Sequence, residues 1–588
     1  MIITLLYLYW FRLNDNNEVV HERIEEAQYI IGSGRNLRMY FFEDNGMYYQ
    51  LPLTWFTHEN RWDMSPGYRE FRNFRFSRFV SPMCFSCHNG HMEISKTTID
   101  RYQGDIHLGI GCESCHGPGD LHVRKEKGEE FDVTNEKAAT IVNPAKLSPK
   151  RRIDVCQQCH FEGAAWALVG NNTWFDFRPG MLLNTHRSVY SPQEVNKKAF
   201  RVANSAYRLS LSRCFTGSHK TMTCDLCHDP HGLTELTTVE FNRQNCQKCH
   251  PPQSLPGENS RLNHTENSDC IPCHMVRTGV ENTLHGVINT DHWIRVDANK
   301  DTIDWTLLRE VSLKNPFETL SPVINSADIE SNIRKGIAYF DFWREKPIIT
   351  AYLDSAYYYV SKGMLESKGK AISYYYIGII HFYRGDHDNA KKALTEALAI
   401  QAGAARVHFA IGEVYSVSNN QELAIKHFRK AVEILPDEPS YLEKLGLELT
   451  KSGAIDEAIS TLEFALTKDK QNPYVYYTLG NLYARNLNDP TNAVSYFKRA
   501  VVLDPDIPDG YLNLGNTYSM LGKYEEAITA YKKEHLFNPN SPNSLVNLGN
   551  LYYNLGKYSD ARSSFEEALR VSPGLKVAQQ FLDEMKDL

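Results

Sequence analysis

The sequence is organised around six copies of one short motif, Cys-x-x-Cys-His, all between Pro82 and His292. The copies read CFSCH at 84–88, CESCH at 112–116, CQQCH at 156–160, CDLCH at 224–228, CQKCH at 246–250 and CIPCH at 270–274. Two thiols at this spacing can add to the two vinyl groups of one haem, and the following His lies close enough to bind the iron. The sequence therefore predicts six covalently attached haem c groups. The attachment residues are Cys84, Cys87, Cys112, Cys115, Cys156, Cys159, Cys224, Cys227, Cys246, Cys249, Cys270 and Cys273, and the proximal ligands are His88, His116, His160, His228, His250 and His274.

Chance does not account for this repetition, because about 0.01 such motifs are expected in a chain of this length and composition. Two alternatives stay open. Structural zinc sites would explain the paired cysteines but not a His after every second Cys. Disulfides within the motifs would close a short and strained ring. Haem attachment is the interpretation that uses all three residues of each copy.

Composition divides the chain into two parts. At 588 residues it should hold more than one domain. All thirteen Cys, including Cys214 outside the motifs, and 17 of the 22 His lie before residue 293. We expect Cys214 to be a buried structural thiol. The net charge of −7 would become more negative with haem propionates, so nucleic acid is excluded as a partner.

The beginning of the chain presents a conflict. Haem c is attached outside the cytoplasm, which predicts a periplasmic or extracellular protein with an export signal. Met1–Phe11 is apolar, but it has no basic residues before it and no small-residue cleavage site after it, and it is too short to span a bilayer. Leu6–Leu13 and Glu18–Ile24, around an Asn-Asp-Asn-Asn turn, instead predict a β-hairpin. That interpretation implies that the true start lies upstream.

The predicted fold class is mainly α. We expect a loop-rich multihaem cytochrome c domain with few short strands, followed by an α-solenoid of tetratricopeptide repeats. Residues 1–80 form a haem-free segment of strands and loops within the cytochrome domain, 81–295 carry the six haems on short helices, and 296–327 are a connector. With six haems, porphyrin can replace side chains as the core of such a domain.

Eleven His before residue 293 lie outside the motifs, and six haems with two His ligands would need six of them. The candidates for distal ligands are His122, His231, His264, His285 and His292, with His186 as a lesser one. His231 and His122 each follow a proximal His beyond a Pro or Gly turn that should point the ring towards a neighbouring haem. The others are expected to be surface or hydrogen-bonded residues: His21, His58, His91, His107 and His219. Because five candidates are convincing, one haem with an open sixth position remains an alternative.

Residues 328–588 contain an internal repeat. The glycines Gly378, Gly412, Gly446, Gly480, Gly515 and Gly549 are separated by 34, 34, 34, 35 and 34 residues. An Ala and then a large residue follow in each copy, which is typical of tetratricopeptide helix pairs that stack to build a common core. We expect a degenerate first pair at 328–366 and a capping helix at 575–588. Such repeats predict a protein partner. Several Tyr and Asn of the first helices either line a concave peptide groove or serve repeat packing.

The stretches CESCHGPGDLH at 112–122 and CDLCHDPH at 224–231 resemble the multihaem cytochrome c superfamily that includes hydroxylamine oxidoreductase and pentahaem nitrite reductase. Over most of the chain, the finer resemblance is to multihaem cytochromes with a C-terminal tetratricopeptide repeat domain. It is carried by IGSG at 31–34, LPLTW at 51–55, MSPGY at 64–68, IVNPAKLSP at 141–149, NSAYRLSLSRCF at 204–215 and TDHW at 290–293. Similar proteins usually have one more CxxCH motif and a His pair upstream, which implies a missing N-terminal segment. The CxxCK motif of nitrite reductases is absent, and no Tyr can be assigned the crosslink of hydroxylamine oxidoreductases.

Three functions fit these patterns. The favoured one is an electron-transfer protein in which closely spaced haems conduct electrons and the solenoid docks a donor or acceptor protein. The second is a multihaem oxidoreductase acting on a small nitrogen or sulfur compound at one open haem. The third is a subunit of an extracellular assembly or filament, so homo-oligomers stay open. Whether the protein is an enzyme, the order of the haems in space and their potentials do not follow from the sequence.

Overall fold

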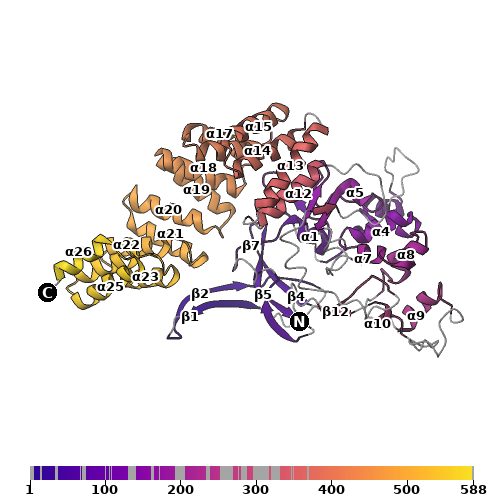
Figure 1. Cartoon of the computed structure of the whole chain (residues 1–588), viewed down its shortest axis with the longest axis horizontal. Helices are drawn as coiled ribbons and strands as arrows, with labels where there is room; N and C mark the ends of the chain where they lie inside the picture. The colour runs from indigo at the N-terminus through magenta and orange to yellow at the C-terminus, as the bar shows by residue number, and fades with distance from the viewer. Residues whose placement is uncertain are drawn as a thin grey trace.

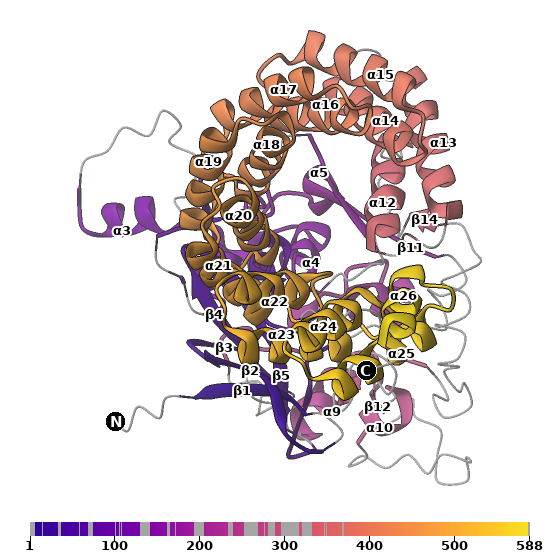
Figure 2. The ribbon, with the colours of Figure 1, turned by 90° about the vertical axis from the view of Figure 1, so that its left-hand side faces the viewer.

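The computed structural model describes residues 6–13, 16–32, 37–57, 59–66, 68, 75–99, 101–104, 106–107, 109–129, 141–160, 165–170, 172–192, 205–232, 239–251, 269–275, 277–279, 288–295, 317–319, 332–345, 347, 350–366 and 370–585. The chain is mainly helical. Its C-terminal helices form an arch around the strands and short helices that precede them (Figures 1 and 2). None of the helices in these ranges is long and apolar enough to cross a membrane.

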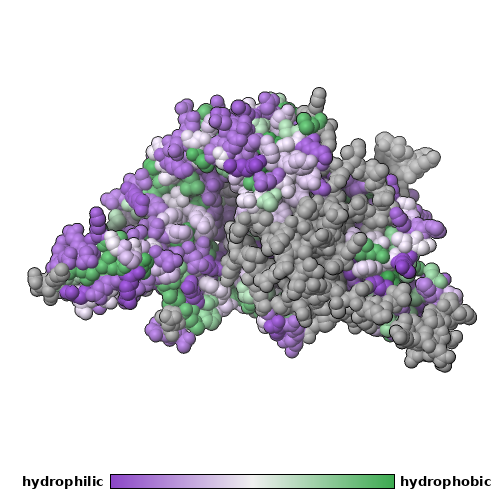
Figure 3. All heavy atoms as spheres, viewed as in Figure 1, coloured by the Kyte–Doolittle hydropathy of each residue, from purple (hydrophilic) through white to green (hydrophobic). Residues whose placement is uncertain are grey.

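The first strands form the predicted hairpin. β1 (Tyr7–Leu13) pairs antiparallel with β2 (Val19–Glu26), with Tyr9 opposite Ile24. The hairpin prediction is confirmed. One face of β1 is exposed and apolar, while the other face packs Trp10 against the next sheet. The hairpin contributes to the hydrophobic surface seen below the solenoid in Figure 3, where the visible face of the repeats is mostly hydrophilic.

A five-stranded antiparallel sheet follows the hairpin. Its strands are β3 (Tyr29–Ile31), β4 (Leu37–Asp44), β5 (Met47–Phe56), β6 (Arg61–Met64) and β7 (Arg78–Phe79). β4 and β5 lie at its centre and meet at Asn45 and Gly46, whose positive φ values of 55° and 79° suit a tight hairpin turn. At eight and ten residues, these two strands are longer than the short strands expected here.

Aromatic side chains cover both faces of this sheet, which explains the length of its strands. Tyr40 and Phe42 of β4 pack on one face, and Phe41 packs on the other. Tyr48 of β5 contacts Phe85 of the first motif edge to face, with 5.1 Å between ring centroids. The sheet therefore has a side-chain core of its own and supports the first motif directly.

The motif region consists of short elements joined by loops. Its helices are α1 (Pro82–His88), α2 (Glu113–His116), α3 (Asp120–Glu126), η1 (Pro144–Lys146), α4 (Pro149–Gln157), α5 (Leu183–His186), α7 (Ser205–Ser210), α8 (Arg213–Gly217), η2 (Cys224–Leu226), α9 (Val239–Gln247) and α10 (Ile271–His274). Its strands are β8 (Glu93–Ile94), β9 (Tyr102–Gln103), β10 (Ala165–Leu168), β11 (Arg187–Pro192), β12 (Arg277–Gly279) and β13 (Ile288–Thr290). β14 (Phe317–Thr319), in the predicted connector, pairs with β11.

Paired helices make up the rest of the chain, as the glycine spacing predicted. They are α12 (Asn332–Glu345), α13 (Thr350–Glu366), α14 (Ala371–Tyr383), α15 (His387–Ile400), α16 (Ala405–Val417), α17 (Gln421–Ile434), α18 (Pro439–Ser452), α19 (Ile455–Lys468), α20 (Pro473–Arg485), α21 (Pro490–Leu503), α22 (Gly510–Met520), α23 (Tyr524–Phe537), α24 (Asn543–Asn554), α25 (Tyr558–Val571) and α26 (Lys576–Glu584). The repeating Gly lets the two helices of a pair approach closely: a Cβ added to Gly412 would lie 2.7 Å from the Phe428 ring.

The turns between successive pairs contact the N-terminal part. Each of three turns presents an Asp to a donor from β5, from the segment before β7 or from the segment after the first motif. The contacts are Thr97 Oγ1 to Asp437 Oδ2 at 2.8 Å, Tyr49 OH to Asp469 Oδ1 at 3.1 Å and Arg75 Nη1 to Asp504 Oδ1 at 2.5 Å. At the far end, His21 of the hairpin is buried against Tyr511 and Phe537. The solenoid is therefore anchored at several points along its length.

Candidate functional site

Each motif folds as a single helical turn. In five motifs the amide of the His donates to the carbonyl of the first Cys at 2.9–3.1 Å, and in the first motif the turn belongs to α1. Positions i, i+3 and i+4 share one face of a helix. Two thiols and one imidazole are therefore presented together, which is the donor set that one haem c requires.

The imidazoles of His116 and His231 face each other. Their ring centroids are 5.8 Å apart and their planes differ by 13°. His116 belongs to the second motif, whereas His231 follows the fourth motif by three residues. The ring of His231 is thus paired with a different motif from the one it follows in sequence.

A second pair joins His228 of the fourth motif to His292. Their centroids are 5.9 Å apart, with 31° between the planes. Burial lowers the pKa of both rings, and the charge of His228 helps to bring the pKa of His292 to about 4. Both rings are therefore neutral at pH 7, as a metal ligand must be.

Backbone carbonyls orient one ring of each pair and also the ring of His274 in the sixth motif. Nδ1 of His116 lies 2.8 Å from the Val142 oxygen, Nδ1 of His292 lies 3.0 Å from the Thr290 oxygen, and Nδ1 of His274 lies 2.6 Å from the Arg295 oxygen. A hydrogen bond from Nδ1–H to a carbonyl leaves the lone pair on Nε2, the arrangement typical of metal-binding His.

The ring separation in each His pair is close to that of two imidazoles bound to one metal. Two imidazole–metal bonds of about 2.0–2.1 Å, together with the two ring radii, give a centroid separation of about 6 Å. The observed 5.8 and 5.9 Å agree with this value. The Cys pairs beside His116 and His228 complete the donor set for a covalently attached haem. Across the described ranges, no group of three or more His, Cys, Asp and Glu side chains is arranged to hold a metal ion by itself.

The third motif lies at the centre of the region. Cys87 Sγ of the first motif donates to the Gln158 carbonyl at 3.4 Å, and Gln158 Nε2 donates to the Ser114 carbonyl of the second motif at 2.7 Å. Arg152, just before the third motif, forms an ion pair with Asp225 inside the fourth. Four of the six motifs are thus in mutual contact through the third.

The other predicted distal ligands are His122, His186, His264 and His285, and the structure describes the first two. His264 and His285 lie outside the described residues, and His122 is half-buried on α3. His186 is fully buried, with its Nε2 2.9 Å from the Thr173 oxygen and its ring against Phe177. Its assignment stays a prediction.

The remaining His occupy varied positions. His21 lies in the interface between hairpin and solenoid, His91 contacts Phe175, and His219 is exposed. His58 lies outside the described residues. Cys214 is half-buried on α8, and burial raises the pKa of its thiol.

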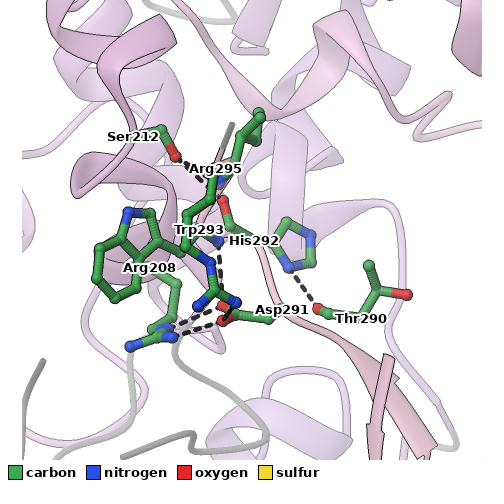
Figure 4. Close-up of polar contacts among 8 residues, drawn as sticks. Arg208, Ser212, Thr290, Asp291, His292, Trp293 and Arg295 are labelled. Atoms are coloured by element: carbon green, nitrogen blue, oxygen red, sulfur yellow. Dashed lines mark hydrogen bonds and ion pairs between the residues drawn. The ribbon is translucent and has the colours of Figure 1, made fainter. Parts of the chain in front are cut away.

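The motifs did not point to a buried ionic cluster beside His292. Asp291 is fully buried and accepts hydrogen bonds from Arg208, Arg295 and the amide of Trp293 (Figure 4). These residues lie in NSAYRLSLSRCF and TDHW, two stretches that carried the family resemblance. A buried Arg is visible in a structure, but a single sequence gives no sign of burial.

Several Tyr and Asn side chains on the first helix of successive repeats form hydrogen bonds with one another. Asn513 Nδ2 donates to Tyr477 OH at 2.9 Å, and Asn547 Nδ2 donates to Asn516 Oδ1 at 2.8 Å. Tyr511 is buried against the hairpin. These contacts favour the packing role over a free peptide groove for the residues involved.

Family profiles identify the C-terminal repeats. A tetratricopeptide repeat profile matches residues 369–437 and 506–573, a TPR repeat profile matches 446–486, and a further tetratricopeptide repeat profile matches 473–507. The C-terminal region therefore contains tetratricopeptide repeats.

The chain is similar to curated proteins of two kinds. It is 27% identical over 180 residues to the human cell division cycle protein 16 homolog, covering 29% of each chain. It is 24% identical over 215 residues to the multiheme cytochrome MtrA of Shewanella baltica, covering 32% of this chain and 58% of that protein. It is 23% identical over 207 residues to the dissimilatory sulfite reductase MccA of Wolinella succinogenes, covering 31% of this chain and 23% of that protein. The chain thus spans well under two thirds of each.

Part of the chain is similar to solved structures. A TPR repeat-containing protein from Cytophaga hutchinsonii matches 42% of this chain and 98% of its own, at 20% identity and a TM-score of 0.36. The Pseudomonas aeruginosa protein pilF matches 36% of this chain and 97% of its own, at 24% identity and a TM-score of 0.32.

Proposed function

We propose that the chain is a multihaem c-type cytochrome that passes electrons along six covalently attached haems and docks a protein partner through its repeats. The observation that carries the proposal is the facing of His116 with His231 and of His228 with His292 at a separation that fits one metal. Haem supplies one-electron exchange at its iron. The Cys pairs of this chain would attach it and the paired His would hold its iron, with His116 and His292 oriented by backbone carbonyls.

The ligands cross between motifs. His231 follows the fourth motif but serves the second, while the fourth takes His292 from beyond the sixth. Such crossing ties separate chain segments together at each cofactor. It also makes the spacing of the haems depend on the protein fold, because the segment between a motif and the His that serves another motif has a fixed length.

We infer a branched order for part of the electron route. Gln158 lies beside Cys87 of the first motif and bonds to Ser114 of the second, and Arg152 pairs with Asp225 of the fourth, which supports a central third haem. The pKa of His88 is lowered by burial and by His160, and that of His160 by burial and by His228, so neighbouring rings in this series are close enough to interact. Electrons arriving at the first haem would reach the fourth through the third.

The repeats support docking of a protein partner, the general role of tetratricopeptide arrays. Their inter-repeat turns are engaged by the N-terminal part, so we propose the remaining solenoid surface as the docking site. Because haem c is attached outside the cytoplasm, we propose a periplasmic or extracellular location.

A second function is favoured by the similarity to a dissimilatory sulfite reductase. One of the six haems would keep an open sixth position for a small sulfur or nitrogen compound. The two functions predict different spectra, because a haem with an open position is high-spin and binds added ligands.

The test is expression with a c-type haem maturation system, followed by intact-mass and spectroscopic measurements. The proposal expects the mass of six haems and a low-spin spectrum that is unchanged by sulfite, nitrite or cyanide. A high-spin fraction that binds one of these compounds would support the enzyme function instead. A chain without covalent haem would overturn both.

A further inference from the structure

One short segment connects two of the motifs. Residues 290–295 contain His292, whose ring faces His228 of the fourth motif. The same segment reaches the sixth motif three residues later: the Arg295 amide donates to the His274 carbonyl at 3.0 Å, and His274 Nδ1 lies 2.6 Å from the Arg295 oxygen. A displacement of this segment would therefore affect both motifs.

Asp291 holds this segment in place. Its carboxylate accepts from Arg208 Nε at 2.8 Å and from Arg208 Nη2 at 2.5 Å, and from the Trp293 amide at 3.0 Å. Arg295 Nη2 approaches the same carboxylate at 3.4 Å. Asp291 is fully buried, Arg208 is 1% exposed and Arg295 is 9% exposed. Figure 4 shows both guanidinium groups directed at the one carboxylate.

Neighbouring groups complete the cluster. The indole of Trp293 lies 5.0 Å from the Arg208 guanidinium and 4.9 Å from that of Arg295. The Ser212 hydroxyl accepts from the Ile294 amide at 2.8 Å and lies 3.4 Å from the His292 carbonyl oxygen. The backbone of His292 and Ile294 is thus bonded to Ser212, the residue directly before α8.

The composition of the cluster has an electrostatic consequence. Two guanidinium groups and one carboxylate lie together in a buried position. Burying such a group is costly, and a well-packed apolar cluster of the same size would often stabilise a fold as well. A role beyond packing is indicated by its position between two haem-attachment motifs.

We infer that Asp291, with Arg208 and Arg295, is a shared positioning element that sets the axial geometry and the reduction equilibrium of the fourth and sixth haems together. This inference rests on the proposed haem function. The carboxylate fixes the segment that supplies the His292 ring and the Arg295 carbonyl. The guanidinium charges of Arg208 and Arg295 favour an added electron at both haems, and the carboxylate charge of Asp291 opposes it.

The experiment uses the full chain with its six haems and a spectroscopic redox titration. Asp291→Asn removes the negative charge and should shift the reduction equilibria of two haems towards the reduced form, by roughly tenfold each for a unit charge about 10 Å away at an effective dielectric constant of about 20. Arg295→Gln removes a positive charge and should shift the same two in the opposite direction. One of the two must be the haem that becomes high-spin in His292→Ala.

Glu448→Gln is the matched control. Glu448 is a carboxylate of the solenoid, 3% exposed and bonded by Ser416 and Lys451, so the same chemical change should move none of the six haems. A shift of one haem only, of all six equally or of none overturns the inference while leaving the proposed function intact. If Asp291→Asn does not fold, Arg295→Gln tests the inference alone: the reduction equilibria of two haems must shift towards the oxidised form. Absence of covalent haem in the parent protein would overturn the proposed function itself, and the inference with it.

Discussion

His231 lies opposite His116, 5.8 Å between ring centroids, although it is only three residues from His228. The separation of His231 from its nearest proximal His arises from the turn between them. Asp229 accepts from the His231 amide at 3.0 Å, and Pro230 restrains the turn. The chain therefore leaves the fourth motif and presents its imidazole to the second.

Replacement of His231 tests this crossed arrangement. His231→Met should raise the midpoint potential of the haem attached at Cys112 and Cys115, by on the order of 0.1 V within the range of about 0.8 V that axial ligands span. The haem of the fourth motif should keep its potential. Spectroscopic redox titration of the variant measures both. His219→Asn, at an exposed His with positive φ, is the control. A change confined to the His228 haem would show that His231 serves its own motif.

Some features of the fold and of the His sites can be predicted from the sequence, and others cannot. The hairpin and the helix pairs were predictable, because turn residues and a fixed glycine spacing are local signals. The long strands β4 and β5 were not, since their aromatic residues face two different clusters and show no simple alternation. The carbonyls of Val142 and Arg295, which orient His116 and His274, were also not predictable, because a backbone group leaves no mark in the sequence.

The repeat glycines offer a test of the solenoid. A Cβ at Gly480 would lie 2.7 Å from two carbons of the Phe497 ring, so Gly480→Ala should cost about 1–3 kcal/mol of unfolding free energy through overpacking. Gly403→Ala is the control, because nothing lies within 4 Å of the added methyl group. Denaturant unfolding followed by far-ultraviolet circular dichroism measures both. Equal effects of the two substitutions would contradict close packing at Gly480.

The hairpin–solenoid contact should weaken in acid. Burial, aided by the charges of Arg75, Lys533 and Arg23, lowers the pKa of His21 from 6.5 to about 4. The unfolded chain therefore binds a proton between pH 6.5 and 4 that the folded chain does not, so stability is full above pH 6.5 and falls as the pH drops towards 4. The loss should reach about 2–3 kcal/mol.

His21→Gln isolates this contribution. The variant should lose less stability than the parent between pH 7 and pH 4.5, as measured by the difference in denaturation midpoints. The comparison with the parent removes the effect of other titrating groups, and His219→Asn should behave as the parent does. An unchanged pH dependence in His21→Gln would mean that His21 becomes protonated without disturbing the interface.

An ion-pair cluster around Arg75 holds the repeats against the N-terminal sheet. Arg75 contacts Asp504 at 2.5 Å and also pairs with Asp506, and its side chain is 15% exposed. Arg75→Gln removes the cation that Asp504 and Asp506 share and leaves Asp506 with Arg12, so docking of the sheet on the solenoid should weaken by about 1–3 kcal/mol. Limited proteolysis of the full chain should then cut faster between the two parts.

Arg429→Gln is the matched control, because Arg429 and Glu457 form an ion pair within the solenoid that is about half exposed on each side. Its loss should cost less than about 0.5 kcal/mol. If Arg75→Gln is cut no faster than Arg429→Gln, the turns of the solenoid do not depend on this anchor. If it is cut faster, a partner bound to the repeats is held at a fixed distance from the haems, which is what electron transfer between two proteins requires.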